Sequence, residues 1–174
     1  PAAFIAEGID QTRGWFYSLL ALSTALFDEA SNKGVITNGT ILAESGLKMS
    51  KKLQNYPDPM KIIDKYGADA MRFYLMNSPA VHADDFRFSE KGVEEVVKKV
   101  ILTLWNSYSF YVTYSRIDNF IPSGKLSLEH VMDYWIISEL NQLIDKVTIS
   151  LEEYDIAKAA RLLAIFIDDL SNWY

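Results

Sequence analysis

The 174-residue sequence predicts two structural segments, an α/β segment followed by an all-α segment. Two short apolar runs, residues 2–6 and 35–42, flank a helical pattern, and this order predicts a strand, a helix and a strand. From residue 89 onward, apolar residues recur at helical spacing in three long segments, which predicts an antiparallel helical bundle. Hydrophobic residues make up 49% of the sequence, enough for one substantial core or two small ones.

The strand, helix and strand form a predicted βαβ unit. The first apolar run ends at Glu7-Gly8, and Asp10 is expected to cap a helix that continues to about Phe27. A right-handed crossover makes the two strands parallel. Because ligands bind beyond the carboxyl ends of parallel strands, we expect the loops 7–11 and 43–52 to lie on the same, ligand-binding side of the sheet.

A compact helical connector is predicted next. Asp58 is a good N-cap and Pro59 a good first residue for a short helix that stops at Gly67. A second short helix over 68–76 follows at once, and both are expected to pack under the preceding loop. The segment 77–88 contains a proline and is expected to be irregular.

Three long amphipathic helices are predicted in the second half. Ser89 is expected to cap the first, the second is expected over about 133–154, and Asp155 is expected to cap the third. We expect the apolar side chains on one face of each helix to form the core of the bundle. These are Val93, Val96, Val97, Val100, Leu104, Trp105, Tyr108 and Tyr111; Ile136, Leu140, Leu143, Ile144, Val147 and Leu151; and Ile156, Ala159, Ala160, Leu163, Phe166 and Leu170.

Composition excludes several classes of protein. There is no cysteine, so disulfides and thiolate metal sites are excluded. His82 and His130 lack metal-ligand spacing and are expected to be surface or capping residues. No apolar run reaches the ~18 residues of a membrane span, and no leader opens the chain, so we expect a cytoplasmic protein. The chain begins at Pro1 without an initiator methionine and ends inside a helical pattern, and we expect it to be a fragment.

The basic run Gly46-Leu47-Lys48-Met49-Ser50-Lys51-Lys52 follows the second predicted strand. Flexible lysines in such a loop suit a polyphosphate, because their charges can follow charge that moves during phosphoryl or nucleotidyl chemistry. On its own, such a basic run is typical of a solvated turn. The sequence around it here favours a polyphosphate-binding site instead. The net charge of −6 argues weakly against a nucleic-acid partner, yet residues 48–72 carry six basic and three acidic side chains.

Four segments carry a resemblance to a known family. The segment 7–16 (EGIDQTRGWF) resembles the adenylate-binding segment of the isoleucyl-tRNA synthetases, which are class I aminoacyl-tRNA synthetases. The lysine run and the following Asn55-Tyr56-Pro57-Asp58-Pro59 resemble that family's KMSKS loop and its exit, and 67–72 is similar to the next helix. The segment 170–174 resembles part of the helical anticodon-binding domain. The resemblance covers essentially the whole chain.

The resemblance implies a division into three parts. Residues 1–57 would be the C-terminal part of a Rossmann-like catalytic domain with the KMSKS-type loop. Residues 58–88 would be a helical connector, and residues 89–174 the N-terminal part of the anticodon-binding domain.

The resemblance also assigns roles in the lysine loop. Lys48 and Lys51 fill the motif's two lysine positions, with Lys51 as the main ATP contact and Ser50 as a hydroxyl donor. The motif's last serine is Lys52 here, so its role departs from the family pattern. Activation expels pyrophosphate from ATP, and mobile lysines would stabilise that leaving group more in the transition state than in the ground state. Mg²⁺ would enter with ATP, and no metal site is expected in this chain.

A second group of residues is expected to bind the aminoacyl-adenylate. The carboxylates of Glu7 and Asp10 suit the substrate α-amino group and the ribose hydroxyls. The backbone at Gly8 allows close approach. Gln11 can donate and accept. By the resemblance, Trp15 would line the isoleucine pocket, and Asn38 stands where many relatives carry a histidine near the adenine.

The family's His-x-Gly-His signature is absent, so half of the ATP site is expected to lie outside this chain. We therefore expect the chain alone to be inactive. The expected parent is an isoleucine-specific enzyme that is monomeric and uses L-isoleucine, ATP and tRNA(Ile), with Lys51, Lys52, Lys61 and Lys65 as candidate tRNA contacts. The alternatives are a valine or leucine enzyme, or a non-catalytic tRNA-binding module.

Overall fold

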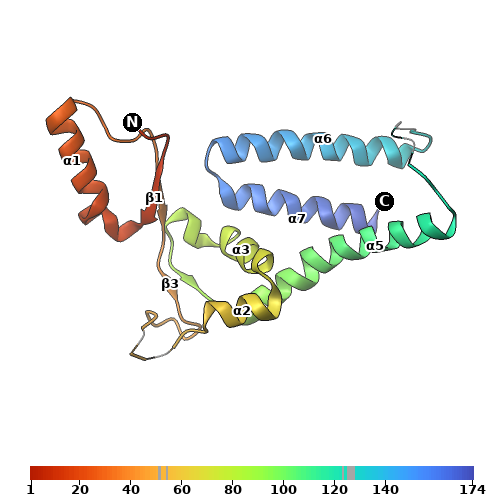
Figure 1. The fold of residues 1–174 in the computed structure, drawn as a ribbon, viewed down its shortest axis with the longest axis horizontal. Coiled ribbons are helices and arrows are strands. Elements are labelled where there is room, and N and C mark those ends of the chain that lie inside the picture. The colour runs from red at the N-terminus through yellow and green to blue at the C-terminus, as the bar shows by residue number, and fades with distance from the viewer. Residues whose placement is uncertain (51, 54, 123, 125–127) are drawn as a thin grey trace.

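The structure is a computed structural model that describes residues 1–50, 52–53, 55–122, 124 and 128–174. Its elements follow one another as β1 (Ile5–Gly8), η1 (Ile9–Arg13), α1 (Trp15–Phe27), β2 (Val35–Asn38), β3 (Ile41–Leu42), α2 (Pro59–Tyr66), α3 (Ala68–Met76), η2 (Pro79–His82), β4 (Phe86–Arg87), α4 (Glu90–Val96), η3 (Val97–Ile101), α5 (Leu102–Ile117), α6 (Val131–Glu152) and α7 (Ile156–Asn172). Figure 1 shows α1 on one side of the molecule, the short helices α2 and α3 in the middle, and the long helices on the other side.

The predicted βαβ unit is present. β1 and β2 pair in parallel, with α1 as the connection between them. The first strand begins three residues later than expected and extends to Gly8. Asp10 does not act as the expected N-cap, because it lies inside η1 and Gly14 occupies the N-cap position of α1. Among the residues of α1, Phe16 alone is buried, so most of this helix is exposed.

The single strand predicted over 35–42 is divided in two. β2 pairs with β1, whereas β3 pairs in parallel with β4. The division lies at Gly39, whose amide donates to the Ala80 carbonyl (2.7 Å) and whose Cα faces the backbone of residue 84 so closely that a Cβ there would lie 1.9 Å from the Asp84 oxygen. The chain changes partner because another backbone segment occupies this place. The expectation of an irregular 77–88 was therefore wrong at its end, where β4 forms.

The helical connector agrees with the prediction. The Met60 amide donates to Asp58 Oδ1 (2.9 Å), Pro59 opens α2, and Gly67 ends it with φ of 88°. A core cluster of Ile62, Ala70, Phe88 and Val93 joins α2, α3, the residue after β4 and α4. Met49, from the lysine loop, packs against this cluster. The connector therefore does pack under the preceding loop.

The first long helix forms as α4, η3 and α5 in direct succession, with η3 a turn of π-helix. Ser89 occupies its N-cap, where the backbone oxygen, rather than the predicted side chain, accepts hydrogen bonds from the Gly92 and Val93 amides (3.1 and 3.4 Å). Gly92 is required by packing, since a Cβ there would lie 2.4 Å from the Tyr74 ring.

The other two long helices, α6 and α7, run side by side in opposite directions (Figure 1). His130 occupies the N-cap of α6, and the Lys158 amide donates to Asp155 Oδ1 (3.1 Å) at the start of α7, as predicted. His82 Nε2 lies 3.7 Å from the same Asp155 oxygen, which ties η2 to this helix start.

The prediction of the bundle core was wrong at several positions, where the residues are 37–60% exposed. They are Leu104, Trp105, Tyr108 and Tyr111 on α5, Leu140, Ile144 and Leu151 on α6, and Leu163 on α7. The C-terminal end of α7 lies close to α5 (Figure 1), and α6 packs on α7, so the aromatic side chains of α5 are left exposed in the described part of the chain. The structure is thus a mixed α/β chain that is mostly helical.

Among the described residues, no helix is long and apolar enough to cross a membrane.

Candidate functional site

The first group of predicted site residues lies at the carboxyl edge of the β1–β2 pair. In the parallel register Glu7 is opposite Thr37 and Gly8 is opposite Asn38. The two strands therefore end together, and they place an exposed carboxylate, an exposed amide and a glycine backbone at one edge. This arrangement presents hydrogen-bond acceptors and donors to a ligand that lies across the strand ends.

Asp10 and Gln11 form a polar turn above this edge. The Asp10 side chain folds back over Gly8: a Cβ added to that glycine would lie only 2.6 Å from Asp10 Oδ1. Gln11 Nε2 donates to Asp10 Oδ2 (3.2 Å), and Gln11 Oε1 accepts from the Trp15 amide (2.9 Å). The Gln11 side chain thus accepts from the first amide of α1 and holds the Asp10 carboxylate beside the strand ends.

Trp15 opens α1 directly after this turn. Its side chain is 45% exposed, whereas the neighbouring Phe16 is buried, and the two rings lie 6.0 Å apart. A tryptophan in the core would be covered. The exposed indole of Trp15 is instead free to line a pocket for an apolar ligand group.

The lysine loop begins with a tight turn at the end of β3. The Ala43 amide donates to the Leu47 carbonyl (2.9 Å), and Leu42 forms an antiparallel bridge with Lys48. Gly46 closes the turn with φ of 81°, a left-handed conformation that favours glycine. A Cβ on Gly46 would also lie 3.1 Å from Arg87 Nε, so the guanidinium of Arg87 lies against the turn.

Asn55 closes the other end of the loop. Its Oδ1 accepts from the Ser50 amide (2.8 Å), and its Nδ2 donates to the Lys48 carbonyl (3.1 Å). Lys48 is exposed and Ser50 is half-buried. Lys51, which the sequence places as the main ATP contact, lies outside the described residues.

Among the described residues, the hydrogen bonds given for the two groups of site residues do not join one group to the other. In the described ranges, the hydrogen bonds of Asp10 and Gln11 stay in the first turn, and those of Asn55 stay in the lysine loop. Figure 1 shows that the strand ends of β1 and β2 lie higher than the lysine loop, which extends beyond β3. Because the strand changes partner at Gly39, Asn38 takes the position beside Gly8 that we expected for the loop 43–52.

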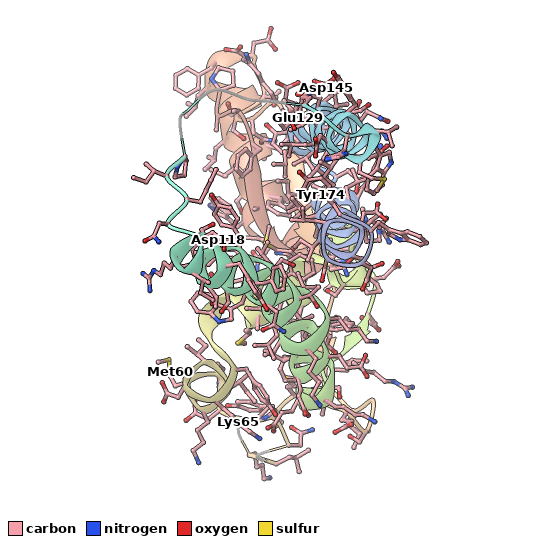
Figure 2. All side chains as sticks on the ribbon, turned by 90° about the vertical axis from the view of Figure 1, so that its right-hand side faces the viewer. Met60, Lys65, Asp118, Glu129, Asp145 and Tyr174 are labelled. Atoms are coloured by element: carbon pink, nitrogen blue, oxygen red, sulfur yellow. The ribbon has the colours of Figure 1, made fainter. Side chains whose placement is uncertain are left out.

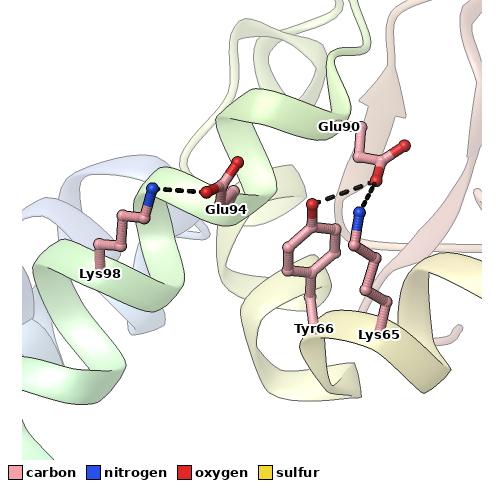
Figure 3. A network of polar contacts seen from close by, with 5 residues as sticks. All are labelled: Lys65, Tyr66, Glu90, Glu94 and Lys98. Atoms are coloured by element: carbon pink, nitrogen blue, oxygen red, sulfur yellow. Dashed lines mark hydrogen bonds and ion pairs between the residues drawn. The ribbon is translucent and has the colours of Figure 1, made fainter.

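Ion pairs tie the lysine-loop side to the helical half (Figure 3). Lys65 Nζ donates to Glu90 Oε1 at 2.7 Å, and Tyr66 OH donates to the same oxygen at 3.1 Å. These hydrogen bonds lower the pKa of Glu90, and the one with Glu90 raises the pKa of Lys65. Lys98 pairs with Glu94 one turn further along, which lowers the pKa of that carboxyl. Of the four lysines proposed from sequence as tRNA contacts, Lys65 is therefore already paired.

A polar contact at the opposite end of the molecule joins α6 to the end of α7. Tyr174 OH donates to Asp133 Oδ1 (3.0 Å), and Asp133 Oδ2 accepts from the His130 and Glu129 amides (2.9 and 3.0 Å). The hydrogen bonds from the two backbone amides contribute most to lowering the pKa of Asp133, and the hydrogen bond from Tyr174 lowers it further. Figure 2 shows Tyr174 and Glu129 far from Met60 and Lys65, so this contact belongs to the helical half.

The described residues contain no cluster of three or more histidine or acidic side chains that could hold a metal ion. Two residues near the lysine loop were missed in the sequence. Asn55 was named only as part of the loop exit, and Arg87 was placed in an irregular segment. The alternation of Phe86, Arg87 and Phe88 was the available signal for the strand that places Arg87 beside Gly46.

Comparison with family models gives two matches. Residues 1–87 match tRNA synthetases class I (I, L, M and V), and residues 133–174 match the anticodon-binding domain of tRNA ligase.

Comparison with curated proteins gives relatives along the whole chain. The chain is 54% identical to the isoleucine–tRNA ligase of Protochlamydia amoebophila, 53% to that of Chlamydia muridarum and 50% to that of Bdellovibrio bacteriovorus. Each alignment covers 100% of this chain and 17% of the relative, so the chain spans about a sixth of these proteins.

Two solved structures are similar in fold. The agnB2 LeuRS of Agrobacterium radiobacter K84, in a ternary complex with tRNA and LeuAMS, matches with a TM-score of 0.77 and 20% identity over 98% of this chain and 22% of its own. The Mycobacterium tuberculosis methionyl-tRNA synthetase in complex with methionyl-adenylate matches with a TM-score of 0.76 and 19% identity, over 97% of this chain and 33% of its own. At these identities the likeness concerns the fold alone.

Proposed function

The chain belongs to the class I tRNA synthetases of the isoleucine, leucine, methionine and valine group, and on that premise we propose that it is a segment of an isoleucine–tRNA ligase. The observation that carries the proposal is the 50–54% identity to isoleucine–tRNA ligases in alignments that cover the whole chain. The same relatives do not favour a valine or leucine enzyme, or a non-catalytic module.

The parent enzyme would join L-isoleucine to ATP, release pyrophosphate, and transfer the isoleucyl group to tRNA(Ile). In this proposal Lys48 and Lys51 stabilise the charge on the leaving pyrophosphate, and Ser50 adds a hydroxyl donor. The exposure of Lys48 beyond the closed turn at Gly46 supports this role. Mg²⁺ would arrive bound to ATP.

The strand-end group would bind the aminoacyl-adenylate. Glu7 and Asp10 would accept hydrogen bonds from the substrate amine and the ribose, while the backbone at Gly8 and the Gln11 amide complete the edge. Asn38 would contact the nucleotide from β2, which its register position beside Gly8 supports. Trp15 would line the isoleucine pocket, which its partial exposure supports.

We propose three parts for the chain: residues 1–57 as the end of the catalytic domain, 58–88 as a connector and 89–174 as the start of the helical anticodon-binding domain. The two family matches, which end at 87 and begin at 133, support a change of role between them. Exposed Lys52 and Lys61 are candidate tRNA contacts. The parent would act as a cytoplasmic monomer.

Because this chain lacks the His-x-Gly-His signature, residues outside it would complete the ATP site. We therefore expect the chain alone to form no adenylate. The test is ATP–pyrophosphate exchange by the full-length parent with isoleucine, valine or leucine. Exchange with the highest kcat/KM for isoleucine supports the proposal, and a preference for valine or leucine overturns it.

A further inference from the structure

We propose that Asn55 is a positioning residue that fixes the lysine loop for catalysis, an inference that rests on the proposed function. Its amide bonds two backbone groups on the loop, the Ser50 N–H at 2.8 Å and the Lys48 carbonyl at 3.1 Å. One side chain thus bridges both residues that flank Met49.

The orientation of the Asn55 amide follows from its partners. A backbone N–H can only donate and a backbone carbonyl can only accept, so Oδ1 must face Ser50 and Nδ2 must face Lys48. Both ends of the amide are engaged with backbone. Asn55 therefore acts on the backbone of the loop through both ends of its amide.

We call the two hydrogen bonds from Asn55 to Ser50 and Lys48 the clamp, and further contacts connect it to the body of the protein. Met49, between the two bonded residues, packs on the core cluster that contains Ile62 and Phe88. Three residues after Asn55, Asp58 caps α2, and α2 is tied to α4 by the Lys65–Glu90 ion pair. The clamp thus connects the backbone of Lys48 to helix α2 and to the packed side chain of Met49.

A lysine that stabilises a leaving group needs a flexible stem on a fixed base, because misplacement of the base loses transition-state contacts. Asn55 holds the backbone of Lys48 in place, and the flexible side chain of Lys48 supplies the mobility. Loss of the clamp is therefore expected to lower kcat for adenylate formation and to leave the KM for isoleucine unchanged, since the strand-end group lies elsewhere.

Two measurements test the clamp. In the full-length parent, Asn55→Ala is expected to speed amide hydrogen exchange at Ser50 by about tenfold, which corresponds to the loss of one hydrogen bond, and to leave exchange at Ala43 unchanged. Asn55→Asp keeps an acceptor for the Ser50 amide and loses the donor to Lys48, so its Ser50 amide should stay protected. Unchanged exchange at Ser50 in Asn55→Ala would overturn the clamp.

In the full-length parent, Asn55→Ala is expected to lower kcat for pyrophosphate exchange by about tenfold, with Asn55→Asp between it and the wild type. Asn141→Ala, an exposed change on α6, is the matched control. Faster Ser50 exchange with unchanged kcat would refute the positioning role. A wild-type parent without isoleucine-dependent exchange would instead refute the proposed function, and the Ser50 measurement would still decide the clamp.

Discussion

Lys65 Nζ lies 2.7 Å from Glu90 Oε1, and this ion pair joins the end of α2 to the start of α4. Tyr66 OH donates to the same carboxylate oxygen (Figure 3). The helix that leaves the lysine loop is therefore tied to the first helix of the second half. The contact is exposed, so it orients the two helices more than it stabilises them.

A pH dependence follows from the Glu90 pKa, which the hydrogen bonds from Lys65 and Tyr66 hold below its ordinary value of 4.5. Above about 4.5 the carboxylate is charged in both the folded and unfolded states, and its full contribution is present. As the pH falls toward the folded pKa, the unfolded state gains its proton first and the contribution is lost. Glu90→Gln should thus unfold at lower urea than the wild type at pH 7, with a smaller difference at pH 3. Glu152→Gln, an exposed change on α6, is the control, and a difference that grows at low pH would contradict the assignment.

Gly39→Ala is expected to destabilise the chain by about 1–3 kcal/mol or more. The new Cβ would lie 1.9 Å from the backbone oxygen of Asp84, which cannot move away as a flexible side chain would. Gly34→Ala is the matched control, since its Cβ would make only ordinary contacts, the nearest at 3.5 Å. Urea unfolding of both variants measures the effect. Equal stability of the two variants would show that the backbone approach at Gly39 is not required.

Asp58→Ala is expected to cost about 1 kcal/mol of unfolding free energy, because α2 loses the side chain that accepts from the Met60 amide. Asp58→Asn keeps an acceptor and should recover most of the loss. Asp64→Ala, exposed within the same helix, controls for loss of charge. A loss for Asp64→Ala as large as for Asp58→Ala would point to charge rather than to capping.

Trp15→Leu in the full-length parent is expected to reduce discrimination between isoleucine and valine. One methylene in an apolar pocket is worth only about 1–3 kcal/mol, so small changes in the pocket wall alter the ratio of kcat/KM values. Tyr17→Leu, an exposed change two residues along α1, should leave the ratio unchanged. The measurement is pyrophosphate exchange with each amino acid. An unchanged ratio in Trp15→Leu would remove Trp15 from the pocket.

The sequence was sufficient for features that depend on near neighbours. The caps at Asp58 and Asp155 and the break at Gly67 form as predicted, because each depends on residues within one helical turn. The parallel pairing of β1 with β2 also follows from the local order of strand, helix and strand.

Features that depend on distant partners could not be predicted in the same way. The strand divides at Gly39 because the backbone at Asp84, 45 positions further along the chain, approaches it. The aromatic side chains of α5 have helical spacing, but spacing does not say which helix covers them, and Tyr108 remains exposed. In the site, the residue types at Glu7 and Lys48 were recognisable, whereas the double hydrogen bond of Asn55 required the folded loop.

In the proposed function, the lysine loop stabilises the leaving pyrophosphate when isoleucine is activated. The most direct test is the single-turnover rate of isoleucyl-adenylate formation by the full-length parent with Lys48→Ala, with Lys61→Ala, an exposed change on α2, as the control. We expect the rate to fall by about 100-fold in Lys48→Ala, with isoleucine affinity unchanged. An unchanged rate, or an equal loss in Lys61→Ala, would contradict the claim.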